Sequence, residues 1–136
     1  MDRSVAGLTE EQARMRLVPS KTTLLGLLKH VTYVEGVWFD QAFTGRTYAE
    51  IGIADTPDTS FTVTASDSIE SVRATYADRV KGSRRALSDV ALRDTVTGRG
   101  GHTVWALSLQ VLRELAQHAG HADILREQIL DRRTDG

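Results

Sequence analysis

Apolar residues recur three and four positions apart over three long stretches of the chain, which is the spacing of amphipathic helices. The first stretch runs from about residue 22 to 43 and the last from about 103 to 130. Between them, a third stretch opens near Asp67 and continues to about Leu87. Ser20 is the expected N-cap of the first stretch, and Asp67 that of the middle one. Two long helices and one medium helix predict an all-α bundle.

Shorter signals frame these helices. Thr9 and Gln12 have the spacing of a capping box and predict a helix that Pro19 keeps short. Glycine, proline and threonine are frequent between the first two long stretches, which predicts an irregular connection with a short extended piece at 61–63. A glycine-rich run at 94–101 predicts a loop before the last helix.

The composition is that of an ordinary globular protein. The chain has 136 residues, of which 40% are hydrophobic and 26% charged, and this size suits one domain spanning 1–136. Its formal net charge is -1, so no nucleic-acid partner is expected, because such binders carry a basic surface. One basic cluster is predicted to be a solvated helix end and comprises Arg79, Lys81, Arg84 and Arg85.

The chain contains no cysteine, which excludes disulfides, thiolate metal ligands and a cysteine nucleophile. Any thiol chemistry therefore needs a sulfur atom from a small molecule. No apolar run approaches the ~18 residues of a membrane span, and the first residues lack the apolar core of a signal peptide. We expect a cytoplasmic protein with no membrane partner.

Several polar residues interrupt the apolar faces of the predicted helices. His30 follows Leu27 by three positions and precedes Val34 by four, so it points into the bundle with the apolar side chains. In the last helix, four polar residues at steps of four, four and three share one face: Gln110, Glu114, His118 and His121. Buried carboxylates and imidazoles are costly unless they are paired or bound to a cation.

A divalent metal ion would offset this cost, since Glu oxygens and neutral His nitrogens are ordinary ligands and helix bundles build sites from inward-facing side chains. His30 with the Glu114–His118 pair supplies three protein ligands and leaves positions open for water or substrate, as in catalytic sites. Zn²⁺ suits this set best, with Ni²⁺ and Fe²⁺ as alternatives. The competing interpretation is a hydrogen-bonded core histidine and a Glu-x-x-x-His pair on a helix surface.

Two segments of the chain resemble a known family. One is Leu24-Leu-Gly-Leu-Leu-Lys-His30, followed by Val34-Glu35 and Trp38-Phe39. The other is Glu114-Leu-Ala-Gln-His118-Ala-Gly-His121-Ala-Asp-Ile-Leu-Arg126-Glu127. They resemble the DinB-like superfamily, and more specifically its actinobacterial branch related to the metal-binding domain of mycothiol-dependent maleylpyruvate isomerase. The similarity covers roughly residues 6 to 131.

This resemblance implies a four-helix bundle with a metal ion near one end, held by His30, Glu114 and His118. It implies a low-molecular-weight thiol, such as mycothiol, as co-substrate. The reaction would be S-transfer to a small-molecule electrophile or thiol-assisted isomerisation of it. Lewis-acid activation of the thiol by the metal is the implied mechanism.

Three further residues are candidates for roles around the metal. His121 suits proton transfer at neutral pH as a general base, or hydrogen-bond donation to the substrate. Trp38 is a candidate wall of the pocket. Arg126 either meets a carboxylate of the thiol or pairs with an acidic neighbour on the surface.

The sequence departs from the family pattern at its beginning, where the first helix is shortened or missing. A missing helix would leave an apolar groove, for which dimerisation is the expected remedy, so we expect a homodimer. Position 110 is Gln where relatives often have His. Two functions remain open: a metal-dependent thiol S-transferase or isomerase, and a non-catalytic dimeric metal-binding or accessory protein.

Overall fold

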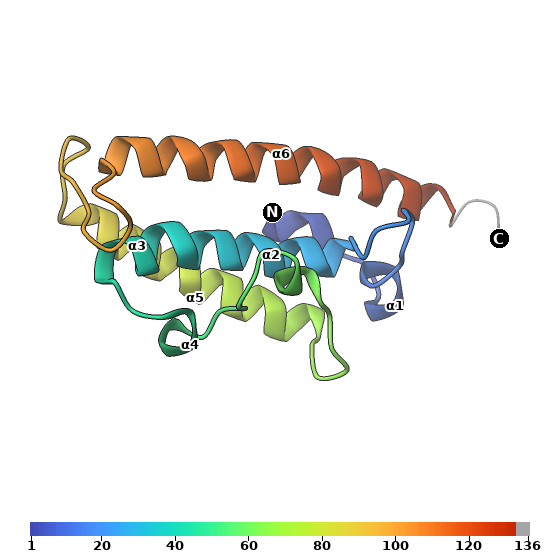
Figure 1. Cartoon of the computed structure of the whole chain (residues 1–136). Coiled ribbons are helices and arrows are strands. Elements are labelled where there is room, and N and C mark those ends of the chain that lie inside the picture. The colour runs from blue at the N-terminus through green and yellow to red at the C-terminus, as the bar shows by residue number, and fades with distance from the viewer. Residues whose placement is uncertain (133–136) are drawn as a thin grey trace.

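A computed structural model describes residues 1–132, and that part of the chain consists of helices and loops without a β-strand (Figure 1). The long helices are α2 (Leu24–Gly36), α5 (Ile69–Ser88) and α6 (Val104–Asp131). Beyond Gly36, α2 continues through a π-helical turn, η2 (Val37–Gln41), into the short α3 (Ala42–Thr44). The prediction of an all-α fold is confirmed. None of these helices combines the length and apolar composition that a membrane span requires.

Four short elements occupy the connections. They are η1 (Asp2–Val5), α1 (Glu10–Ala13), α4 (Tyr48–Ile51) and η3 (Thr59–Phe61). The capping box predicted for α1 is present, since the Thr9 side chain accepts from the N–H of Gln12 and the Gln12 side chain accepts from that of Thr9. The extended piece predicted at 61–63 is wrong for Phe61, which ends the 3-10 turn η3, whereas the backbone at Thr62 is extended.

Two predicted helix starts are shifted. Thr23, not Ser20, caps α2, and Ser68, not Asp67, caps α5. Asp67 instead accepts a hydrogen bond at 2.7 Å from the ammonium group of Lys29, which joins the start of α5 to α2. The side chain therefore ties two helices together rather than capping one.

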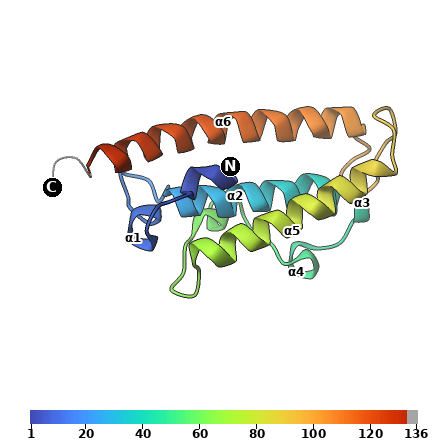
Figure 2. The ribbon, with the colours of Figure 1, turned by 180° about the vertical axis from the view of Figure 1, so that it is seen from behind.

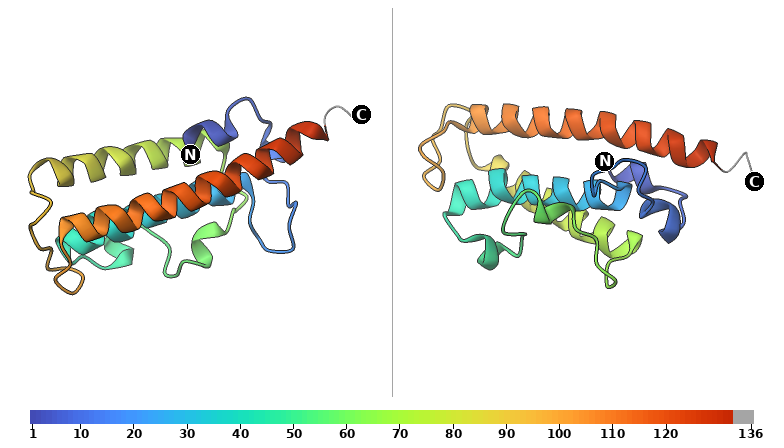
Figure 3. Two further views of the ribbon diagram at one scale, coloured as in Figure 1. Left: turned by 90° about the horizontal axis from the view of Figure 1, so that it is seen from above. Right: turned by 45° about the vertical axis from the view of Figure 1, so that its right-hand side comes forward.

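The central helix of the fold is α2, and both α5 and α6 pack against it (Figure 3). The N-terminal turn η1 lies beside α6 and contacts all three long helices (Figure 2). Because neighbours cover α2 on most sides, its leucines are fully buried: Leu24, Leu25, Leu27 and Leu28. A polar side chain on this helix is therefore buried as well.

The basic cluster on α5 is not uniformly solvated. Arg79 is half-buried, and its guanidinium donates at 2.9 Å to Asp40 of η2 and at 2.7 Å to the carbonyl of Ile51. The prediction of a solvated helix end is therefore wrong for Arg79, which anchors α5 to η2 and α4. Lys81, Arg84 and Arg85 are exposed, as predicted.

Candidate metal centre

The structure brings three of the predicted site residues together between α2 and α6. One ligand atom from each of His30, Glu114 and His118 can be chosen so that all three lie within 4.8 Å of one another. His30 is 6% exposed and His118 is 8% exposed, while Glu114 is half-buried. The polar atoms of three ionisable side chains thus converge at a point that is mostly shielded from water.

The placement follows from the helices. His30 lies in the middle of α2, whose surroundings are apolar. Glu114 and His118 are one turn apart on α6, on the side that packs against α2. The periodicity of the sequence therefore brings this trio together through helix packing alone.

The tautomer of His30 is set by Ser60. The Oγ of Ser60 donates to the carbonyl of Pro57 at 2.6 Å and lies 2.7 Å from Nδ1 of His30. Because the hydroxyl proton points to Pro57, the oxygen accepts the second bond, and Nδ1 of His30 carries the hydrogen. Nε2 of His30 then keeps its lone pair and is the atom available to a metal ion.

Aromatic rings hold the His30 imidazole in place. Phe61 stacks on it with ring centroids 4.0 Å apart and planes 12° apart. The ring of His118 meets it edge-on at 4.5 Å, and Tyr33 stacks on it at 6.0 Å. Both Ser60 and Phe61 come from η3, so this single turn sets the orientation and the tautomer of the ligand.

The side-chain oxygens of Glu114 and the ring nitrogens of His118, both on α6, differ in their hydrogen-bond partners. Glu114 Oε1 accepts from the side-chain amide of Gln110 at 2.9 Å, while Oε2 lies 3.4 Å from Nε2 of His118. Nδ1 of His118 is buried and has no hydrogen-bond partner among the residues that the structure describes. The His118 ring, with the Glu114 carboxylate at its Nε2 and the His30 imidazole edge-on beside it, belongs to a donor set that fits a divalent metal ion.

Burial keeps the two imidazoles neutral. Burial, together with the neighbouring His118, lowers the pKa of His30 to about 4, and Glu114 opposes the shift. Burial also lowers the pKa of His118, although Glu114 acts against the shift. Both rings are therefore uncharged at pH 7, which is the form that binds metal ions.

The other predicted residues lie at different places around this cluster. His121 is exposed, with its ring 5.6 Å from that of His118. Trp38 is half-buried on η2, beneath the guanidinium of Arg99. Arg126 donates at 2.9 Å to the carbonyl of Ser4 and so ties α6 to the N-terminal turn. Among the residues that the structure describes, Arg126 has no acidic partner, so the predicted pairing with an acidic neighbour is not seen there.

Three residues of the site were missed in the sequence. Ser60 and Phe61 lie in a threonine-rich connection that carries no helical period, and Tyr33 lies within α2 without a sequence signal of its own. Ser60 and Tyr33 also line a cavity of about 290 Å³ between α2, the loop before η3 and the start of α5. None of the three predicted ligands lines this cavity, which therefore adjoins the metal site through Ser60.

The fold and this cluster define an all-α protein with a buried His₂Glu site between two long helices. The family model of the mycothiol-S-transferases matches residues 1–131, and the chain belongs to that family. The match confirms the resemblance to the mycothiol-related branch of the DinB-like proteins. Searches of the curated proteins and of the solved structures give no match.

Proposed function

We propose that this chain is a metal-dependent mycothiol S-transferase that joins the thiol to a small electrophile, with His30, Glu114 and His118 as metal ligands. The family supports the thiol and the type of reaction. The observation that carries the metal is the buried trio of converging donor atoms, with one imidazole nitrogen of His118 orphaned. Zn²⁺ is the first candidate, with Ni²⁺ and Fe²⁺ as alternatives.

A metal ion bound here would act as a Lewis acid that lowers the pKa of the thiol. The chain's own residues prepare the site. Ser60 holds His30 in the tautomer that leaves Nε2 free, and Gln110 holds one oxygen of Glu114. We assign the thiol proton to an imidazole nitrogen of His121, and its exposure and its ring contact with His118 support this role. Trp38 and Arg126 stay candidates for substrate contact.

The first experiment measures metal content by elemental analysis of the purified protein. We expect about one metal ion per chain, and its loss in His118→Ala. His102→Ala is the matched control, because His102 is an exposed histidine in the loop before α6 and is not part of the cluster. A wild-type protein that stays metal-free after incubation with Zn²⁺ or Ni²⁺ would refute the metal site.

The second experiment measures thiol consumption by the metal-loaded protein with mycothiol and an uncharged electrophile. We expect turnover that depends on the metal and falls in His121→Ala, about 10²-fold if His121 is the general base. A metal-loaded protein that shows no turnover with several classes of electrophile would favour the non-catalytic metal-binding or accessory role instead.

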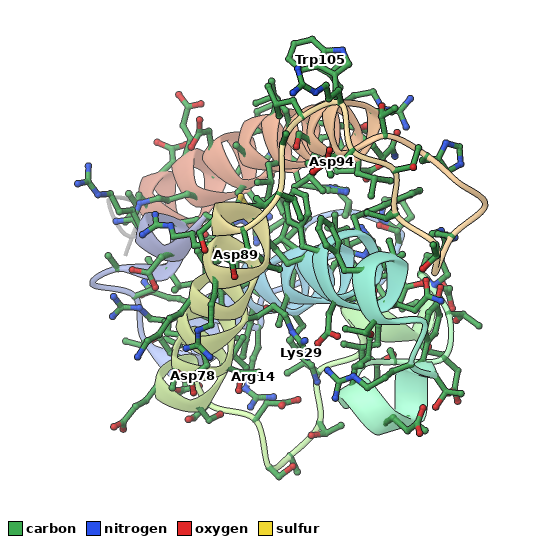
Figure 4. All side chains as sticks on the ribbon, turned by 90° about the vertical axis from the view of Figure 1, so that its left-hand side faces the viewer. Arg14, Lys29, Asp78, Asp89, Asp94 and Trp105 are labelled. Atoms are coloured by element: carbon green, nitrogen blue, oxygen red, sulfur yellow. The ribbon has the colours of Figure 1, made fainter. Side chains whose placement is uncertain are left out.

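We also propose that the protein is a homodimer that pairs through α6. Trp105, Leu109 and Leu112 follow each other at steps of four and three and are exposed by 54%, 44% and 63%. Figure 4 shows Trp105 projecting away from the other helices. A second copy would cover this stripe with an identical one in a two-fold interface. We place the whole dimer in the cytoplasm, each chain being one domain over 1–136.

A further inference from the structure

A second polar site lies at the C-terminal end of α2. Arg99, from the loop before α6, is half-buried, and its Nη1 donates to Gln41 Oε1 at 3.3 Å and to the Tyr48 hydroxyl at 3.2 Å. Its Cζ lies 4.8 Å from the ring centre of Trp38. The guanidinium is thus held by an amide, a phenol and an indole face, all of which are uncharged.

Arg99 lacks an acidic partner within the part of the chain that the structure describes. Two other partly buried cations near α2 have one: Lys29 pairs with Asp67 and Arg79 with Asp40. A half-buried cation whose contacts are all neutral keeps donors and charge free for an anion from outside the chain.

The backbone next to Arg99 is closely packed and has little conformational freedom. Gly98 lies so close to η2 and α3 that a Cβ atom on it would be 2.4 Å from the Gln41 carbonyl and 2.6 Å from that of Ala42. Its N–H donates to Ala42 at 3.0 Å. Trp38 and Gln41, which meet Arg99, both belong to the π-helical turn η2, a feature that often marks functional sites.

Aromatic residues connect this site to the metal centre. The Tyr48 ring meets the Tyr33 ring edge-on at 5.9 Å, and Tyr33 in turn stacks on His30 at 6.0 Å. Burial and a hydrogen bond to Tyr48 raise the pKa of Tyr33 to about 12, so this connection is uncharged at pH 7. Trp38 follows His30 by eight residues, which is about 12 Å along a helix.

We propose that Arg99 binds a carboxylate of the electrophilic substrate, with Trp38 and Tyr48 flanking it. The inference rests on the proposed function for its reaction, since the electrophile would then be an acid. The eight-residue step from His30 to Trp38 separates this anion site from the first proposed metal ligand by about 12 Å along the helix. A planar guanidinium matches a carboxylate with two parallel hydrogen bonds, which makes this anion the expected one.

Anion binding can be measured without any turnover. The chain has two tryptophans, so Trp105→Phe leaves Trp38 as the only indole and as a reporter beside Arg99. We would titrate this metal-free protein with pentanoate, with pentanamide as the uncharged probe, at constant ionic strength. We expect pentanoate to cause a saturable change in Trp38 emission and pentanamide to cause none. Equal responses to both probes, or none, would overturn the inference.

Variants of Arg99 test whether this residue binds pentanoate. Arg99→Gln should raise the apparent Kd for pentanoate at least about tenfold, and Arg99→Lys should raise it less, because the charge remains. Arg93→Gln is the matched control, since Arg93 is an exposed arginine of the same loop. Circular dichroism would establish that each variant is folded. A Kd that is unchanged in folded Arg99→Gln would contradict the proposal.

Kinetics separate this inference from the proposed function. For a carboxylic electrophile and its methyl ester, the kcat/KM of the wild type should favour the acid, and Arg99→Gln should lower that preference about tenfold or more through KM. Turnover without such a preference would leave the transferase intact and overturn the role of Arg99. Pentanoate binding without any turnover would leave the anion site standing and refute the transferase.

Discussion

Ser60 Oγ lies 2.7 Å from Nδ1 of His30, and its hydroxyl proton is directed to the carbonyl of Pro57 at 2.6 Å. The conformation of the loop that carries Ser60 therefore determines which nitrogen of the buried His30 ring carries the hydrogen. Hydrogen-bond partners on the far nitrogen of a metal-binding histidine fix its orientation and raise its basicity. The loop before α5 is therefore part of the proposed metal centre, although it supplies none of the predicted ligands.

Ser60→Ala should weaken metal binding by about 10- to 100-fold while the fold persists. The substitution removes one of the two hydrogen-bond partners of the His30 ring and leaves the Pro57 carbonyl, so the tautomer is held less firmly and Nε2 can become protonated. It also leaves a buried N–H and a carbonyl without this partner, at a cost of about 1–3 kcal/mol in the free energy of unfolding. Competition with a chromophoric chelator measures the affinity, and urea denaturation measures the stability.

Thr62→Ala is the control for Ser60→Ala. Thr62 is exposed and lies two residues further along the same loop. Its backbone carbonyl accepts a hydrogen bond from Lys29, and Thr62→Ala keeps this carbonyl. The metal affinity of Thr62→Ala should match that of the wild type within about a factor of two. Equal affinities for Ser60→Ala and Thr62→Ala would show that the hydroxyl does not position His30.

Gly26→Ala should disturb the same centre from the side of α2. A Cβ atom there would be 2.6 Å from the backbone oxygen of Phe61, so the turn carrying Ser60 and Phe61 must move away. We expect a loss of about 1–3 kcal/mol in the free energy of unfolding, with a parallel loss of metal affinity. Gly82→Ala in α5 is the control, because open space surrounds that position. There the change should stabilise the helix by up to about 1 kcal/mol; a Gly26→Ala protein that behaves likewise would contradict the tight packing.

Much of the fold could be predicted because its long helices follow a clear apolar period. The predicted last helix, from about 103 to 130, agrees with α6 within one residue at each end, and Thr103 proves to be its N-cap. The predicted caps Ser20 and Asp67 were wrong because several Ser, Thr and Asp side chains precede each helix. Only tertiary contacts, such as the Lys29–Asp67 pair, decide among them.

The convergence of His30, Glu114 and His118 could be predicted because each residue breaks an apolar face of a helix. Ser60 and Arg99 could not, since both lie in loops whose course depends on close approaches at Gly26 and Gly98. A loop residue carries no period, so nothing in the sequence indicates which of many hydroxyls or arginines reaches a helix.

The metal-free protein should lose stability as the pH falls from 6.5 to 4. Burial lowers the pKa of His30 to about 4, whereas an unfolded histidine titrates near 6.5. Within this window the unfolded chain binds a proton that the folded protein does not, so the free energy of unfolding falls with pH. His30 alone should contribute a decrease of about 2 kcal/mol between pH 7 and 5, measured by urea denaturation.

His30→Asn isolates this contribution, because it keeps a donor near the Nδ1 position and removes the titration. The variant should lose about 2 kcal/mol less than the wild type over the same pH interval. Glu35 acts in the opposite sense in both proteins: burial raises its pKa, so protonating it favours the folded state as the pH falls. Identical pH dependence in the two proteins would mean that His30 is not the titrating group.

Leu112→Glu should convert the proposed dimer into a monomer. Leu112 is the most exposed large apolar residue of α6, at 63%, and a carboxylate there would be buried against apolar side chains in the proposed two-fold interface. Light scattering after size-exclusion chromatography should give twice the 15.0 kDa chain mass for the wild type and the single mass for the variant. Gln117→Glu adds the same charge to an exposed position of α6 outside the stripe and should remain dimeric. A monomeric wild type would refute pairing through α6 and leave the metal centre unaffected, because all three predicted ligands come from one chain.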